Sequence, residues 1–346
     1  MTFWHKLPKP IIVLAPMADV TDAPFRRMIA KYSAHTRKDG TIGGPDVMWT
    51  EFVSADGLIR ATPEGRKKLM ADLLYTEAER PIVAQLFSSH PEYMEYSARI
   101  VMELGFDGID INMGCPDRSI EKQGCGSAMI KNPAVAQEIV RAVKRGAPML
   151  PVSVKTRIGY NQNMLDTWLP ALLDVEPAVI TIHARTRKEM SKVPARWEHV
   201  TEAVTIRNAV QNEAWQKTHP NTPRTLIFGN GDVLSVADAE AKVKETGADG
   251  AMLGRAIFGN PWLFHPEYDI TTVSLEERLR VMVEHTKLFE TLLPFKNFAI
   301  MKKHYKAYVH NFDGAKELRT ILMEQTSSDA IERVVNSFFE AQQNAL

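Results

Sequence analysis

Cys115 is the residue whose type and neighbours best suit a proton transfer. It stands in the run Asn112-Met113-Gly114-Cys115-Pro116, at the end of a short apolar segment. Gly114 permits a close approach of the backbone, and Pro116 stiffens the turn. A thiol with an ordinary pKa of about 8.5 is mostly protonated at neutral pH, so it can act as a general acid. A free cysteine can instead be a small buried hydrophobic residue, but the position beside Asn112 favours the acid role.

Four other polar side chains lie in or just after short apolar segments. Lys155 is a cation of a kind rarely buried without a partner, so it suits the neutralisation of an anionic ring. Gln85 can donate and accept hydrogen bonds at the edge of a ring, and His183 can line the same site. Each has a structural alternative: Lys155 can extend to the sheet edge, while Gln85 and His183 can be satisfied core residues. Arg185 can contact a ligand or form an ion pair.

Two glycine-rich turns indicate a phosphate site. Residues 229–232 read Gly-Asn-Gly-Asp, and residues 254–260 read GRAIFGN. Backbone N–H groups that glycine leaves accessible bind phosphate oxygens, and Arg255 adds a planar fork of donors. One such turn is explained by chain reversal alone, whereas two turns with an arginine favour an anion.

These side chains fall at the ends of eight short apolar segments, which we expect to be β-strands. The segments cover residues 11–15, 47–49, 82–87, 108–112, 152–155, 179–183, 225–228 and 250–253. Stretches with helical spacing lie between them, among others at residues 91–104, 133–145 and 236–246. Eight strands alternating with helices predict an α/β fold, a (β/α)8 TIM barrel whose active site lies at the C-terminal strand ends. An open doubly wound sheet would require G-x-G-x-x-G after the first strand, where this chain has Ala-Pro-Met-Ala.

The strand pattern ends after residue 264, and four helical segments follow. They cover residues 275–293, 297–311, 315–325 and 329–341. We therefore expect a catalytic barrel over residues 1–264 and a small all-helical domain over residues 265–346. The stretches 33–45 and 211–224 are expected to be surface loops or extensions.

The charge balance limits how this chain can bind nucleic acid. Lys plus Arg and Asp plus Glu both number 42, so the formal net charge is zero and binding requires a local patch. Residues 295–312 contain no acidic residue, and their basic and aromatic side chains alternate: Lys296, Lys302, Lys303, Tyr305, Lys306, Tyr308 and Phe312. Such a pattern is typical of an RNA-binding surface, although a solvated helix face has the same composition.

The cysteine content and the absence of long apolar runs predict the compartment. Cys115 and Cys125 are the only cysteines, which excludes a disulfide framework, and no histidine cluster accompanies them to bind a metal. No apolar run approaches the ~20 residues that span a bilayer, and the first residues resemble no signal peptide. We expect a cytoplasmic monomer that binds neither membrane nor metal.

Eight motifs, in order between residues 11 and 264, resemble the tRNA-dihydrouridine synthase family. They are LAPMADVTDAPFR (14–26), TEFVSADGL (50–58), AQLF (84–87), DGIDINMGCP (107–116), SVKTRIG (153–159), IHARTR (182–187), GNGDV (229–233) and DGAMLGRAIFGNPWLF (249–264). The combination of NMGCP, KTRIG and GNGD is specific. Two stretches depart from the family pattern. Residues 188–194 stand where many members carry a glutamine and a glycine-rich run, and the stretch 33–46 is longer than expected for the family.

The resemblance implies reduction of the C5–C6 double bond of uridines in tRNA. Hydride would come from FMN, recharged by NADPH, and the proton from Cys115. The implied FMN-binding residues are Pro16, Met17, Ala18, Gln85, Lys155, His183, Asn230, Gly231, Asp232, Gly254 and Arg255. Asn112 would position the base, and tRNA contacts would come from Arg185, Arg187, Lys302, Lys303 and Lys306. Because the uridine must leave its stack, an unstacked loop nucleotide is favoured over a paired one.

Two other functions fit part of the pattern. A small-molecule flavin reductase of the dihydroorotate dehydrogenase type would use a strand-end cysteine and no RNA, which leaves the basic tail unexplained. An RNA-binding protein that has lost its chemistry would not need Cys115, Lys155 and His183 together.

Overall fold

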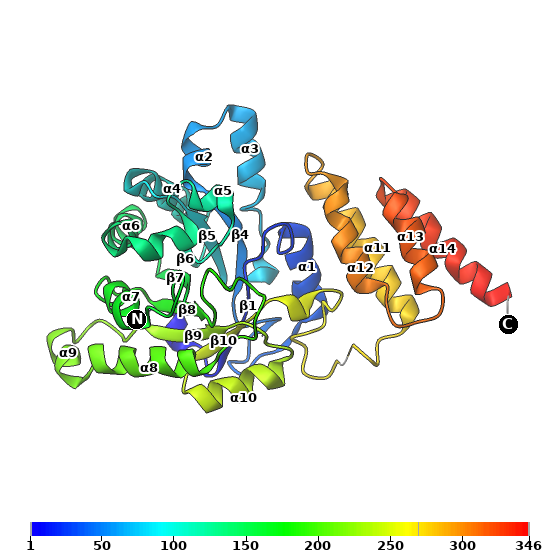
Figure 1. Cartoon of the computed structure of the whole chain (residues 1–346). Helices are drawn as coiled ribbons and strands as arrows, with labels where there is room; N and C mark the ends of the chain where they lie inside the picture. Colours follow the sequence, from blue (N-terminus) through cyan, green and yellow to red (C-terminus); the bar gives the residue numbers. More distant parts are fainter. Residues whose placement is uncertain (1, 269, 345–346) are drawn as a thin grey trace.

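Eight parallel strands form the centre of the molecule in the computed structural model, which describes residues 2–268 and 270–344. Their order is β1-β10-β9-β8-β7-β6-β5-β4, and a parallel bridge between Val13 and Val47 joins the two ends of the sheet. The strands are β1 (Ile11–Leu14), β4 (Met48–Ser54), β5 (Ile82–Phe87), β6 (Gly108–Met113), β7 (Val152–Arg157), β8 (Val179–His183), β9 (Leu226–Asn230) and β10 (Gly250–Leu253). The predicted (β/α)8 TIM barrel is therefore confirmed (Figure 1).

The strands are buried because helices cover the outside of the barrel. Every residue of β1, β5, β6, β9 and β10 is buried, as expected for parallel strands with both faces covered. The helices of this part are α1 (Ala23–Tyr32), α2 (Ala55–Arg60), α3 (Pro63–Ala71), α4 (Pro91–Glu103), α5 (Arg118–Glu121), α6 (Pro133–Gly146), α7 (Leu165–Leu173), α8 (Glu198–Val210) and α10 (Val236–Thr246). Short 3-10 helices are η1 (Phe3–Lys6), η2 (Glu77–Glu79), η3 (Gly126–Lys131) and η4 (Arg255–Ile257).

Proline and glycine set the helix ends that the sequence predicts. Pro91 and Pro133 stand at the starts of α4 and α6, where a missing N–H costs nothing. Gly247 ends α10 in the left-handed region, at φ +70°. Asn132 occupies the cap position of α6, but its side chain makes no capping hydrogen bond.

Two stretches expected to be loops or extensions contain regular structure. The strands β2 (His35–Thr36) and β3 (Ile42–Gly43) pair as an antiparallel hairpin, and the Arg37 guanidinium is buried there, donating to the Pro45 carbonyl at 2.7 Å. A further helix, α9 (Glu213–Thr218), begins where the Asn212 side chain accepts hydrogen bonds from two backbone N–H groups. Of the two alternatives, loops and extensions, the structure therefore favours extensions, and side-chain hydrogen bonds supply their backbone with partners.

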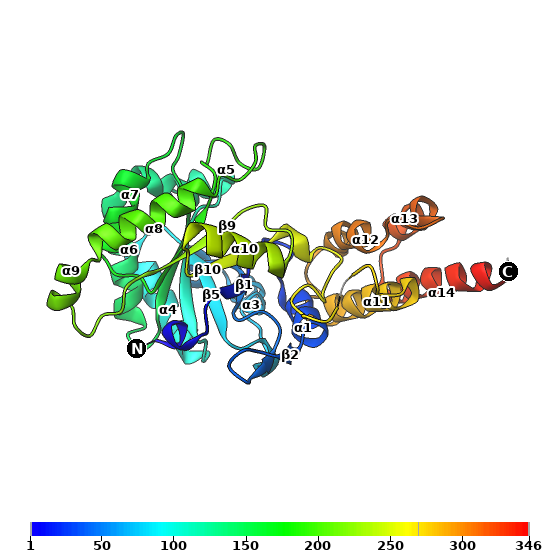
Figure 2. The same ribbon diagram turned by 90° about the horizontal axis from the view of Figure 1, so that it is seen from below.

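The predicted all-helical tail is confirmed by the C-terminal helices: α11 (Leu275–Leu292), η5 (Phe298–Met301), α12 (Lys302–Tyr308), α13 (Ala315–Glu324) and α14 (Ser328–Asn344). They lie to one side of the barrel in both views and contact it through α1 and α11 (Figures 1 and 2). The segment 297–311 is a 3-10 turn followed by a short α-helix instead of one helix. None of the described helices is long and apolar enough to span a membrane.

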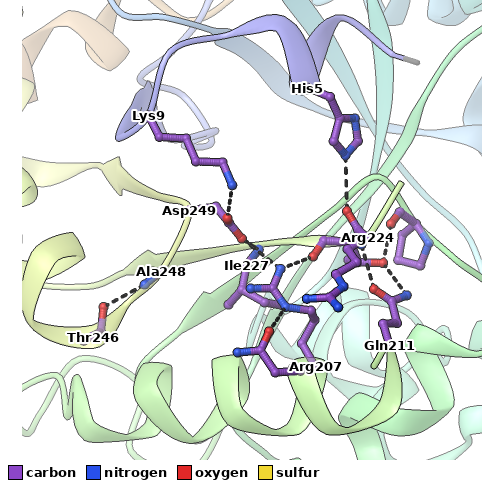
Figure 3. Close-up of polar contacts among 12 residues, drawn as sticks. His5, Lys9, Arg207, Gln211, Arg224, Ile227, Thr246, Ala248 and Asp249 are labelled. Atoms are coloured by element: carbon purple, nitrogen blue, oxygen red, sulfur yellow. Dashed lines mark hydrogen bonds and ion pairs between the residues drawn. The ribbon is translucent and has the colours of Figure 1, made fainter. Parts of the chain in front are cut away.

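A polar cluster closes the N-terminal end of the barrel (Figure 3). Asp249 accepts hydrogen bonds from Arg207 Nη1 at 3.0 Å and from the Ile227 N–H at 2.9 Å, and it also pairs with Lys9. The backbone carbonyl of Asp249 accepts from the first residue of β1. These contacts connect strands β1, β9 and β10 at the end of the barrel that serves stability, which leaves the opposite end for chemistry.

Candidate active site

A pocket of about 610 Å³ opens at the C-terminal ends of the strands. It is lined by Ala15, Pro16, Met17, Lys155, His183, Arg185, Ser191, Asn230, Gly231, Asp232, Val233, Leu234, Met252, Gly254, Arg255 and Ala256. All of the expected cofactor-binding residues except Ala18 and Gln85 are therefore brought together. A second cavity of about 730 Å³ lies among the β2–β3 hairpin, the start of α10, residues 260–268 and Ile270, and none of the predicted site residues lines it.

The loop after β9 places an arginine–aspartate network at one end of the pocket. Asp232 pairs with Arg185 through one oxygen and with Arg255 through the other, and it accepts a hydrogen bond from the Ala195 N–H at 2.8 Å. The hydrogen bond from Arg185 is the main cause that lowers the pKa of Asp232, so this carboxylate stays ionised. Asp232 thus fixes both guanidinium groups at the pocket wall.

Gly231 cannot be replaced by a larger residue at this position. Its φ is +120°, and a Cβ would lie 2.9 Å from the Ala195 Cβ and 3.2 Å from the His183 ring. The glycine therefore allows the loop to pass close to His183 while its backbone borders the pocket.

His183 is a neutral ring in cationic surroundings. Burial lowers its pKa well below the usual value, and the nearby charges of Arg157, Lys155, Arg185 and Arg255 lower it further. Its Nε2 lies 3.0 Å from Arg185 Nη1. Since arginine only donates, Nε2 accepts this hydrogen bond and the proton of the neutral ring resides on Nδ1.

Lys155 carries its ammonium into the same pocket. Its Nζ donates to Asn230 Oδ1 at 3.2 Å, and Asn230 Nδ2 donates to the Met252 carbonyl at 2.8 Å. Burial, followed by the charge of Arg157, lowers the pKa of Lys155 to about 8. Together with the arginines at the other end, Lys155 gives the pocket the positive potential that an anionic ligand requires.

Gln85 belongs to a buried network instead of the pocket lining. Gln85 Nε2 donates to Asp110 Oδ2 at 2.6 Å, and Asn112 Nδ2 donates to Gln85 Oε1 at 3.1 Å. Ser153 Oγ donates to the other oxygen of Asp110 at 2.6 Å, and burial raises the pKa of Asp110 to about 6. Through the hydrogen bond to Gln85, this network fixes the orientation of the Asn112 side-chain amide.

Asn112 in turn holds the loop that carries Cys115. Its Oδ1 accepts hydrogen bonds from the backbone N–H groups of Gly114 at 3.1 Å and Cys115 at 2.9 Å. The Cys115 carbonyl accepts from both the N–H and the hydroxyl of Ser127, each at 2.9 Å. Cys115 is half-buried, and burial raises the pKa of its thiol, so it is protonated at neutral pH.

Arg157 is a site residue whose role the sequence analysis missed. Its buried guanidinium donates to the Gly114 carbonyl at 2.8 Å and to the carbonyls of Thr186 at 3.1 Å and Met190 at 3.0 Å. It thereby ties the loop of Cys115 to the loop after β8. The motif K-T-R-I-G contains this signal. Arg157 follows Lys155 by two positions in the same strand, and side chains two positions apart face the same side of a strand, here the barrel interior.

The two arginines expected to contact tRNA both have partners within the chain. Arg185 is only 2% exposed and pairs with Asp232, as its ion-pair alternative predicts. Arg187 Nε donates to Glu121 at 2.8 Å, and its guanidinium lies over the Tyr160 ring. Because Glu121 lies in α5, Arg187 connects the loop after β8 to the segment that follows Cys115. Direct RNA contact by either arginine stays a prediction.

The basic segment of the C-terminal helices is arranged differently from the sequence pattern. Lys302 and Lys303 are partly exposed and Lys306 is exposed, with Lys303 Nζ 3.9 Å from Asp19. The expectation that aromatic residues share their surface is wrong for Tyr305 and Tyr308, which are fully buried. Helical spacing places these tyrosines on the face that packs into the core, opposite the lysines.

Comparisons with known proteins agree over nearly the whole chain. Residues 13–343 match the family model described as dihydrouridine synthase (Dus). The chain is 37% identical over 342 residues to a Bacillus subtilis (strain 168) protein named "Probable tRNA-dihydrouridine synthase 2", covering 97% of this chain and 96% of the relative. It is also 37% identical over 344 residues to "Probable tRNA-dihydrouridine synthase" of Staphylococcus aureus (strain COL), covering 98% and 96%.

Among solved structures, the complex of 2-naphthoyl-CoA reductase with 2-naphthoyl-CoA resembles this chain with a TM-score of 0.51. The two are 12% identical, and the match covers 76% of this chain and 50% of the reductase, so this likeness concerns the fold alone. The family match spans the barrel with its strand-end site as well as the C-terminal helices. This chain therefore belongs to the dihydrouridine synthase (Dus) family.

Proposed function

We propose that this protein reduces the C5–C6 double bond of uridines in tRNA to dihydrouridine, with FMN as its cofactor and NADPH as the electron donor. The observation that carries the proposal is the placement of a protonated thiol, Cys115, at the same end of the barrel as a cationic pocket. Membership of the dihydrouridine synthase family supports the reaction, and the names of the relatives support tRNA as the substrate.

The charges of the pocket residues suit FMN. Four cationic side chains lower the pKa of His183, which shows that the pocket is positively charged. The Asp232 carboxylate already pairs with two arginines, so the binding of an additional anion is favoured. Arg255 and the backbone of Gly231 and Gly254 would hold the phosphate. Lys155, the neutral ring of His183 and Met17 all line the pocket and would contact the flavin ring. When bound and reduced by NADPH, FMN would supply hydride to C6 of the uracil.

Cys115 donates the proton in this mechanism. Its Sγ–H bond breaks as the C5–H bond of the uracil forms, and solvent later returns a proton to the thiolate. Asn112 and Arg157 keep the thiol in place by binding the peptide group between Gly114 and Cys115, and Ser127 binds the Cys115 carbonyl on the other side. Asp110 and Gln85 act through Asn112 and fix its orientation.

The proposal also includes the region that binds the tRNA and the cellular setting. We assign residues 1–264 to the catalytic domain and residues 265–346 to tRNA binding through Lys302, Lys303 and Lys306, with the uridine extracted from its stack. Arg185 and Arg187 would act by positioning the loop after β8, with Arg187 also near the RNA. The free thiols of Cys115 and Cys125 suit a reducing cytoplasm, in which we propose that the protein acts as a monomer.

The test is formation of dihydrouridine in unmodified tRNA by the purified protein supplied with FMN and NADPH, measured by mass spectrometry of the digested RNA. Dihydrouridine at a defined position is the expected result. Turnover of free uridine or another free pyrimidine without RNA would favour a small-molecule reductase. Protein that binds tRNA but neither retains FMN nor oxidises NADPH would favour a non-catalytic RNA-binding protein.

A further inference from the structure

The segment α2–α3 (residues 55–71) begins beside the loop that carries Cys115. It follows directly on β4, so its first residues lie at the C-terminal end of the barrel. Asp56 in α2 lies 3.7 Å from His90 Nε2, in the loop after β5. The adjacent Ser89 hydroxyl donates to the Gln123 carbonyl at 2.6 Å, and Gln123 lies between Cys115 and Cys125 in the same loop. The start of α2–α3 is thus connected to the loop of Cys115 through His90 and Ser89.

The other end of α2–α3 contacts the C-terminal helices. Asp72, the C-cap residue of α3, lies 2.8 Å from the ammonium of Lys296, which follows α11. In Figure 1, α2 and α3 project from the top of the barrel, and α3 lies on the side nearer to α11 and α12. The segment therefore extends from the Cys115 loop to the element that we propose to bind tRNA.

The surface of this segment is basic, in contrast with the neutral chain. Four basic residues, Arg60, Arg66, Lys67 and Lys68, accompany two acidic ones, Asp56 and Glu64. Arg60, Lys67 and Lys68 are exposed, and Arg66 is partly exposed. Lys68 has one partner, Glu64 at 3.4 Å on the helix surface. Within residues 2–268 and 270–344, no acidic side chain lies within ion-pair distance of the other three.

A helix that serves only to cover the barrel does not require these cations. Leu69 of α3 packs closely against Gly57 of α2: a Cβ added at Gly57 would lie only 2.6 Å from Leu69 Cδ1. Lys67 and Lys68 are exposed and take no part in this contact. Arg66 and Lys67 have no acidic partner in the described part of the chain, and the pair of Lys68 with Glu64 is exposed and weak. Cations of this kind, placed between a catalytic loop and an RNA-binding element, are suited to phosphate oxygens.

We propose that α2–α3 is a second RNA-binding surface, which holds the phosphate backbone of the tRNA on the β4 side of the active site through Arg66, Lys67 and Lys68. This inference rests on the proposed function and extends it. The RNA would be held on two sides of the strand ends, by α3 and by α12, with the target uridine between them. Such contacts are independent of base sequence, so they contribute affinity and salt dependence.

The test compares the triple variant Arg66→Gln, Lys67→Gln, Lys68→Gln with the wild type in direct tRNA binding over a range of salt concentrations. We expect about a tenfold loss of tRNA affinity at low salt, and a fall of about 2 in the slope of log K against log salt. In steady state, KM for tRNA should rise with little change in kcat. Retained FMN absorbance and an unchanged melting temperature would establish that the variant is folded.

A matched control removes three cations from the far side of the barrel: Lys217→Gln, Arg224→Gln, Lys244→Gln, in and near α9 and α10. Since α9 lies at the opposite edge from the C-terminal helices, this variant should bind tRNA like the wild type (Figure 1). Equal affinities and salt slopes for the two triple variants would overturn the inference. If the wild type forms dihydrouridine in tRNA, that result leaves the proposed function intact; a wild type inactive on tRNA would instead reject the function itself.

Discussion

Lys296 Nζ lies 2.9 Å from Glu51 Oε2, so a lysine that follows α11 forms an ion pair with a carboxylate of β4 inside the protein. The lysine side chain is 15% exposed and the glutamate side chain 7%. The second oxygen of Glu51 accepts a hydrogen bond from the N–H of Asp19, whose φ of +53° is unusual for a residue other than glycine. Met17, two residues earlier, lines the pocket. The C-terminal helices are thus connected to the loop that borders the pocket.

Replacing Lys296 by Met should destabilise the protein by about 3 kcal/mol, because two carboxylates would lose their buried partner. Urea unfolding at neutral pH measures the loss. Lys287→Met is the matched control, since Lys287 pairs with Glu332 at 2.7 Å on the surface, where such a pair contributes less than about 1 kcal/mol. Equal effects of the two variants would mean that the Lys296 pair is no more important than a surface pair.

Cys115→Ala should retain FMN and its reduction by NADPH, yet lower dihydrouridine formation by about 10²-fold or more, because the general acid is lost. Stopped-flow absorbance of the flavin separates the two half-reactions. Cys125→Ala serves as the control: this thiol is buried, its sulfur lies 3.5 Å from the Gln123 carbonyl, and it does not line the pocket. A Cys115→Ala variant with full activity would eliminate the acid role.

The affinity for FMN should fall as the pH rises through about 8. Lys155 has a pKa lowered to about 8 by burial, so it is charged below this pH and neutral above it, and only the charged form attracts an anion. Between pH 7 and pH 9.5 we expect about a tenfold loss of FMN affinity, typical of one charged hydrogen bond. Fluorescence titration of the apoprotein measures this. Lys155→Arg should remove the pH dependence, since arginine stays charged; the same dependence in that variant would implicate another group.

Arg157→Met should lower kcat for uridine reduction by at least about tenfold while NADPH oxidation with an artificial acceptor changes less. The Gly114 carbonyl would lose its donor, and the loops after β6 and β8 would no longer be tied together. Arg157→Lys should restore little, because one ammonium cannot replace the planar fork that reaches three carbonyls. Full activity of the lysine variant would show that only the charge matters.

Replacing Lys302, Lys303 and Lys306 together by Gln should weaken tRNA binding and flatten its salt dependence, because phosphate contacts release counterions. Filter binding at several salt concentrations gives the slope. If α3 contributes separately, the loss should add to that of the α3 variant. An unchanged slope would mean that α12 is not part of the RNA-binding surface.

Much of the fold could be predicted because its signals are local. Short β-branched segments, prolines at helix starts and glycines after helix ends depend on neighbours within a few residues. The same holds for Cys115 and for the two glycine-rich turns, since a parallel barrel brings all C-terminal strand ends to one face. The hairpin at residues 35–43 was missed because its stability depends on Arg37, whose buried contacts include the distant carbonyl of Arg80.

What the sequence by itself determined was the barrel, its active end, and most residues of the pocket. Only the tertiary structure decided which of these side chains bind each other, because the partners lie far apart in the chain: Arg187 and Glu121 are separated by 66 positions, and Arg185 and Asp232 by 47. It also decided that Gln85 supports Asn112, and that the face of α12 that carries Tyr305 and Tyr308 is the one that packs into the core. Residue type and spacing give a side chain its chemistry, but its desolvation and its partner depend on packing, which no local pattern encodes.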